Sequence, residues 1–89
     1  MNTNAFFLSD PGHGWLRVPM HSVRLLGIEA QISAFSYISP EGDVAYLEED
    51  CDAQKYLDAA KARGWNVQIV EKHSNARAAC RDYPRFPGA

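Results

Sequence analysis

The chain has 89 residues, of which 46% are hydrophobic, so it can build one folded core but is too short for two domains. We expect neither a secretory leader nor a membrane span, because the N-terminal segment has no basic stretch before a long apolar run and no segment approaches about 20 apolar residues. Two cysteines do not make a disulfide framework, so we expect a reduced, cytoplasmic protein.

The first third of the chain predicts a hairpin followed by a short helix. Residues 4–9 and 15–18 have the apolar character of strands and are joined by the turn DPGHG, in which Pro11 fixes its own φ and the glycines accept positive φ. Pro19 suits the first turn of a helix, and Gly27 suits the position just after its end. This helix should be about two turns long.

The remaining chain predicts a second hairpin, a longer helix and a last strand. Residues 32–38 are rich in β-branched and aromatic side chains, and residues 44–48 return after the loop SPEGD. A helix then begins at Asp50 or Asp52, either of which is a suitable N-cap, and it ends at Gly64. Residues 65–70 alternate as a strand does.

The C-terminal residues, 74–89, are rich in arginine and contain two prolines, so we expect them to be largely irregular, with one helical turn around residues 77–81. The predicted element order is ββαββαβ within a single domain, residues 1–89. Because hairpins dominate, the sheet of about five strands should be mostly antiparallel, with both helices on one face. The fold class is therefore an α+β two-layer sandwich.

Charge is distributed unevenly along the chain. Residues 41–58 carry seven acidic residues against one lysine, whereas residues 59–89 carry six basic residues against two acidic ones. Four of these acids, at residues 48–52, form an acidic block where the predicted strand of residues 44–48 ends. We expect the acidic block to be a recognition surface for a basic partner, with an aromatic anchor beside it. The predicted partner-binding residues are Glu48, Glu49, Asp50, Asp52, Tyr46 and Trp15. The alternative is that these carboxylates only cap the helix and solvate the strand end.

The arginines of the C-terminal residues carry an alternative hypothesis, a small nucleic-acid-binding module. Arg77, Arg81 and Arg85 would contact phosphates, while the interleaved Tyr83 and Phe86 would stack on bases. The other interpretation is a segment that packs its aromatic rings on the sheet and pairs its arginines with the acidic block.

Catalytic and metal-binding patterns are weak in this sequence. No close pair of cysteines or histidines marks a zinc site, and no cofactor-binding motif occurs. The carboxylates around Cys51 would raise the pKa of its thiol, which argues against a cysteine nucleophile. His13, in the DPGHG turn, could serve an enzyme together with a nearby carboxylate. We expect no catalytic residues, no metal and no cofactor.

Two strings, SDPGHGWLRVP at residues 9–19 and YLEEDCDA at residues 46–53, resemble an uncharacterised family of small domains. LLGI at residues 25–28 and EKHSNAR at residues 71–77 extend the resemblance. The family is carried by phages, plasmids and integrative elements of Gram-negative bacteria. The resemblance implies an accessory or counter-defence protein of a mobile element. Together with the small size, the uneven charge and the lack of a catalytic pattern, it leads us to expect a non-catalytic protein of the bacterial cytoplasm that inhibits a host protein such as a CRISPR defence effector. Because a small sheet with an uncovered edge favours dimerisation, we expect a monomer or a homodimer. The final stretch, residues 77–89, departs from the family pattern.

Overall fold

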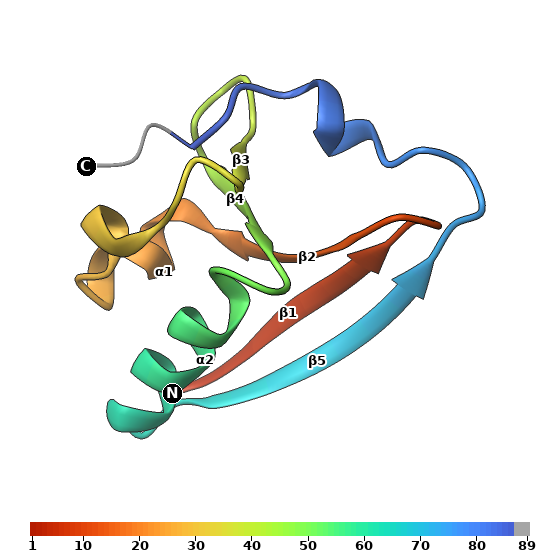
Figure 1. Cartoon of the computed structure of the whole chain (residues 1–89). Helices are drawn as coiled ribbons and strands as arrows, with labels where there is room; N and C mark the ends of the chain where they lie inside the picture. The colour runs from red at the N-terminus through yellow and green to blue at the C-terminus, as the bar shows by residue number, and fades with distance from the viewer. Residues whose placement is uncertain (87–89) are drawn as a thin grey trace.

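The computed structural model describes residues 1–86, in which five strands form one mixed sheet (Figure 1). The strands are β1 (Asn2–Ser9), β2 (Gly14–Pro19), β3 (Tyr37–Ile38), β4 (Val44–Glu48) and β5 (Asn66–His73). Their order across the sheet is β3-β4-β2-β1-β5. All neighbouring strands are antiparallel except β1 and β5, which are parallel. The predicted α+β class and the mostly antiparallel sheet are confirmed.

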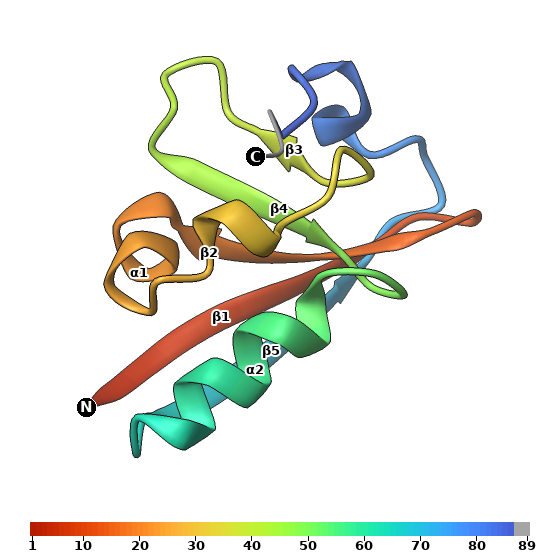
Figure 2. The ribbon, with the colours of Figure 1, turned by 60° about the vertical axis from the view of Figure 1, so that its left-hand side comes forward.

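Both helices, α1 (Met20–Leu25) and α2 (Ala53–Ala62), cover the same face of the sheet, as predicted (Figure 2). Gly27 and Gly64 follow them with φ of 70° and 76°, a conformation in which glycine has no Cβ to clash. α1 contacts β2 and β4, whereas α2 contacts β5, and the apolar sides of both helices join the main core. The main core includes Leu16, Val18, Val23, Ala45, Leu47, Tyr56 and Ala60.

The second face of the sheet is covered in part by the C-terminal segment, which we define as residues 74–86 (Figure 1). This segment contains a 3₁₀ helix, Ala79–Asp82, close to the predicted helical turn. Beyond it, Arg85 forms an antiparallel bridge with Tyr37 of β3, and the side chain of Phe86 is buried in the main core. The segment therefore crosses the second face and then closes the β3 edge. The last three residues of the predicted irregular segment, residues 87–89, lie outside the described part of the chain.

One predicted strand is much shorter than the sequence indicates. Residues 32–38 form a strand only at Tyr37–Ile38, and a 3₁₀ helix, Glu29–Gln31, precedes them. The reason is a tertiary contact: Ile32 is buried in the core, while the hydroxyls of Ser33 and Ser36 donate hydrogen bonds to the carboxylate of Asp52. In contrast, β5 is longer than the predicted residues 65–70. No helix within residues 1–86 has the length and apolar character needed to cross a bilayer.

Candidate functional site

The acidic block between β4 and α2 is divided between the interior and the surface. Glu48 is 9% exposed, and its carboxylate accepts hydrogen bonds from the backbone N–H groups of Asp50 and Cys51, both at 2.9 Å. Asp52 is fully buried, whereas Glu49 and Asp50 are exposed. The expectation of four carboxylates on one outer surface is therefore wrong, because two of them stabilise the loop and turn from which α2 begins.

Asp52 is the centre of a buried hydrogen-bond network. It occupies the N-cap position of α2, but its carboxylate makes no capping bond to the helix. It accepts instead from the backbone N–H and hydroxyl of Ser33 at 3.1 and 2.7 Å, from the hydroxyl of Ser36, and from the ammonium of Lys55 at 3.0 Å. Burial alone would raise the pKa of Asp52, but these hydrogen bonds outweigh it and lower the pKa. The charged carboxylate thus ties residues 33–36 to α2.

A second buried carboxylate anchors the C-terminal segment. Asp10, in the turn between β1 and β2, accepts hydrogen bonds from Nε and Nη2 of Arg81 at 2.7 and 2.8 Å and from the backbone N–H of Ala78 at 3.0 Å. The turn itself donates the N–H groups of Gly12 and His13 to the same carboxylate. The hydrogen bond from Arg81, followed by that from Ala78, holds the pKa of Asp10 well below its usual range. Asp10, and not the acidic block, is the partner of this arginine.

The two predicted aromatic anchors are both covered. Tyr46 is buried and lies edge to face against Tyr83, with ring centroids 5.4 Å apart. Trp15 is buried beneath the guanidinium of Arg81, which lies 5.1 Å from its ring centroid. The indole N–H of Trp15 has no hydrogen-bond partner within residues 1–86, an arrangement that costs about 1–3 kcal/mol. Neither ring projects into solvent as an anchor.

The predicted phosphate-binding residues are Arg77, Arg81 and Arg85, and the structure gives them different roles. Arg77 is exposed and forms an ion pair with Asp82 at 2.6 Å, while Arg81 is held by the turn carboxylate. The Arg85 guanidinium lies over the ring of Tyr37 at 5.2 Å and donates to a backbone carbonyl at 3.1 Å. Of the three, Arg85 has no carboxylate partner among the described residues. The interpretation in which the segment packs its aromatic rings on the sheet agrees with this geometry.

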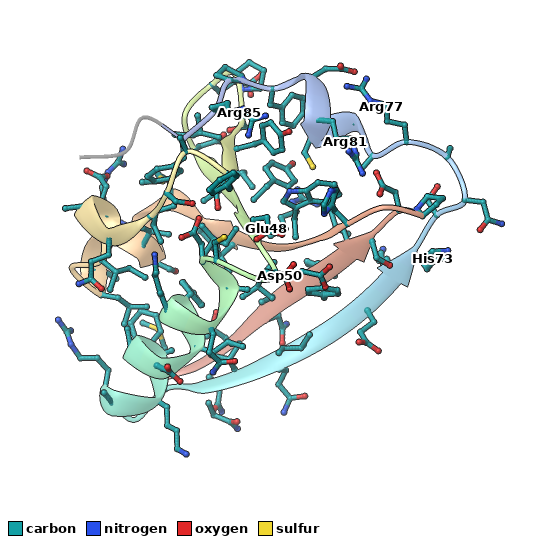
Figure 3. All side chains as sticks on the ribbon, viewed as in Figure 1. Glu48, Asp50, His73, Arg77, Arg81 and Arg85 are labelled. Atoms are coloured by element: carbon teal, nitrogen blue, oxygen red, sulfur yellow. The ribbon has the colours of Figure 1, made fainter. Side chains whose placement is uncertain are left out.

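A hollow of about 400 Å³ lies between the C-terminal segment and the end of β4. We call it the aromatic–arginine hollow, because its lining includes Trp15, Phe35, Tyr37, Arg81 and Arg85. Glu48 and Asp50 line it from β4 and the loop that follows, and Figure 3 shows them apart from Arg81 and Arg85 of the C-terminal segment. The side chain of Phe35 is 63% exposed, so an aromatic ring stands in water at this opening.

The surroundings of both thiols disfavour the thiolate form. Partial burial, a hydrogen bond to Glu48 and the neighbouring carboxylates all raise the pKa of the exposed Cys51 thiol. Burial, together with the charge of Asp10, raises the pKa of Cys80 to about 11. Within residues 1–86, no three metal-ligating side chains lie close enough to hold an ion. The His13 ring lies beside Trp15, with centroids 6.2 Å apart, and lines the hollow.

Sequence reasoning did not identify the hollow. The sequence predicts Phe35 and Tyr37 as strand residues, and Arg85 as one of three arginines that contact phosphate in the nucleic-acid hypothesis. The alternation of aromatic residues and arginines near the C-terminus was the signal that could have indicated the hollow. In such a segment the aromatic rings pack on the sheet, while the guanidinium groups lie over aromatic rings of the strands. No protein family, curated protein or solved structure was found to match the chain.

Proposed function

We propose that the protein is a non-catalytic accessory protein that binds another protein through the aromatic–arginine hollow. The observation that carries this proposal is the exposure of Phe35 at a concave surface. Removing a phenylalanine side chain from water is worth roughly 1.5–3 kcal/mol, and the fold leaves most of this free energy unused. A partner that covers Phe35 would gain it.

The composition of the hollow supports a protein as the occupant. Aromatic residues and arginine are enriched at the energetic centres of protein interfaces. The Arg85 side chain is already held over Tyr37 and bonded to the carbonyl of Ala34, so little side-chain entropy is lost when a partner contacts it. A preorganised arginine beside an exposed ring is a suitable anchor for a partner segment.

The charges of the hollow favour a partner that carries both signs. Asp50 and Glu48 contribute negative charge, whereas Arg85 contributes positive charge that no carboxylate neutralises within residues 1–86. A phosphate backbone would meet the carboxylates as well as the arginine. The geometry therefore favours a protein surface over a nucleic acid.

The resemblance to the mobile-element family supports a host protein as the partner and its inhibition as the outcome. A component of bacterial defence, such as a CRISPR effector, is the partner class that this context favours. The contacts differ from those predicted from the sequence, because Glu48 is largely engaged and Asp52 is fully buried. In the revised proposal, Phe35 and Arg85 are the main contacts, and the exposed Asp50 and Glu49 contribute at the edge.

Affinity capture with matched variants tests this proposal. The wild-type protein, the double variant Phe35→Ala/Arg85→Glu, and the control Leu25→Ala/Lys61→Glu would each be used to capture proteins from a Gram-negative lysate, with quantitative mass spectrometry. The control makes the same kinds of change at exposed residues of α1 and α2. Circular dichroism would establish that all three proteins are folded.

We expect a bacterial protein that the wild type and the control retain and the hollow variant loses. With the purified partner, the hollow variant should bind at least about 30-fold more weakly, which corresponds to a change of roughly 2 kcal/mol. A partner held equally by all three proteins would show that binding occurs elsewhere. If the wild type and the hollow variant both converted a substrate chemically, that activity would contradict the non-catalytic assignment.

A further inference from the structure

The outer edge of β5 is a long, exposed strand edge. β5 (Asn66–His73) pairs with β1 on one side, and no other strand of residues 1–86 pairs with its second side (Figure 1). Ile69 and Val70, at its centre, are 45% and 44% exposed. Proteins usually shorten, cover or charge such an edge, because its free N–H and C=O groups pair readily with another strand.

Two hydrogen bonds show which backbone groups face outward. The N–H of Asn66 donates to the carbonyl of Met1, and the N–H of Ser74 donates to the carbonyl of Ser9, so the even-numbered residues direct these groups toward β1. Successive residues of a strand alternate the side on which they bond. The odd-numbered residues therefore face outward, and they are Val67, Ile69, Glu71 and His73.

These four residues are symmetric about Val70. An antiparallel pair of identical strands related by a two-fold axis at Val70 sets residue 67 opposite residue 73 and residue 69 opposite residue 71. Each of these pairs exchanges two backbone hydrogen bonds, so all eight outward groups are satisfied. Val70 then lies opposite its own copy in a pair that brings side chains close together. We propose that β5 pairs in this register with β5 of a second copy of the chain.

The charges of β5 favour this antiparallel arrangement. Glu71 and Lys72 lie in the second half of the strand, while residues 66–68 are uncharged. Antiparallel pairing sets Glu71 opposite Ile69 and Lys72 opposite Gln68, so no like charges meet. Parallel pairing would bring each charge next to its own copy, which destabilises a sheet. The edge is self-complementary only in the antiparallel orientation.

The dimer should be weak and independent of the aromatic–arginine hollow, since no residue of β5 lines it. Strand pairing alone buries less surface than the roughly 1,200–2,000 Å² of stable complexes. We therefore expect a dimer that forms on the order of 10–100 μM in sedimentation velocity experiments. Ile69→Pro removes an outward N–H without removing a bond to β1, and Ile69→Lys adds a charge; both variants should remain monomeric.

Cysteine cross-linking tests the register with matched positions. In a Cys51→Ser background, which removes the exposed thiol, Val70→Cys should form a disulfide-linked dimer under mild oxidation. Ile69→Cys is equally exposed but would lie two positions out of register with its copy, about 6.8 Å along the strand, and should not cross-link. A monomer at about 500 μM, a dimer that persists in both Ile69 variants, or cross-linking through residue 69 in place of residue 70 would overturn the proposal.

Discussion

Replacing Asp52 by asparagine tests the most unexpected feature of the acidic block, its buried hub. The fully buried carboxylate accepts from Ser33, Ser36 and Lys55. Asparagine keeps the shape but offers one acceptor oxygen, and its NH₂ group would face donors. Hydrogen bonds to a charged group contribute about 1.5–3 kcal/mol, and breaking a buried charged network costs more. We expect Asp52→Asn to lose about 2–4 kcal/mol of unfolding free energy.

That loss is large for a chain of this size. Eighty-nine residues predict a total stability of roughly 4–13 kcal/mol, and about 1 kcal/mol corresponds to 4–8 °C in Tm for a domain of 60–100 residues. Urea denaturation followed by Trp fluorescence would measure the change. Asp58→Asn is the control, because Asp58 is an exposed residue of the same helix and, among residues 1–86, its side chain accepts a hydrogen bond from Gln54 alone. Its free energy of unfolding should lie within about 0.5 kcal/mol of the wild type.

The pH dependence provides a second measurement of the same network. Because the folded pKa of Asp52 is lowered from its ordinary value of 3.8, its stabilisation is present above that value and is lost as pH falls through the lower folded pKa. The difference between the wild type and Asp52→Asn should therefore narrow below about pH 4. Equal stability of the two proteins at pH 7 would refute the reasoning, as would a difference that does not depend on pH in the acidic range.

Three other predictions concern the C-terminal segment, nucleic acid and one glycine. In a Cys51→Ser background, Asp10→Asn should release the C-terminal segment and increase the rate at which a thiol reagent modifies Cys80 by about tenfold or more. The control Asp82→Asn removes only the exposed ion pair with Arg77 and should leave this rate unchanged. An unchanged rate in Asp10→Asn would contradict the anchoring role of Asp10. Filter binding at low salt should show no retention of DNA or RNA, because Arg77 and Arg81 are paired; retention that falls steeply with salt would restore the nucleic-acid hypothesis. Gly64→Ala should lower the unfolding free energy by about 1 kcal/mol through backbone strain alone, since φ is 76° and an added Cβ would meet no atom within 4 Å; denaturation that matches the wild type would contradict this.

Local rules were sufficient for most of the secondary structure. Pro11 and Pro19 fix their own φ, and Gly27 and Gly64 take a positive φ without strain, so the hairpin and both helix ends could be placed from neighbouring residues. The same rules failed at residues 32–38, because their β-branched and aromatic character does not reveal that Ser33 and Ser36 bond to Asp52. A distant acceptor outweighed local strand propensity there.

The candidate site depended on contacts that the sequence does not encode locally. Asp10 and Arg81 are separated by 71 positions in the chain. From the sequence alone, Arg81 could have paired with a carboxylate of the acidic block, and Asp10 with another arginine. The acidic block looked like one surface because its residues are adjacent in the chain, yet Glu48 and Asp52 turn inward while Glu49 and Asp50 stay in water. Composition and spacing determined the α+β class, the element order and the helix ends. Only the tertiary structure decided which charges are buried and where the C-terminal segment lies, because burial and ion pairing depend on the path of the whole chain and not on neighbouring residues.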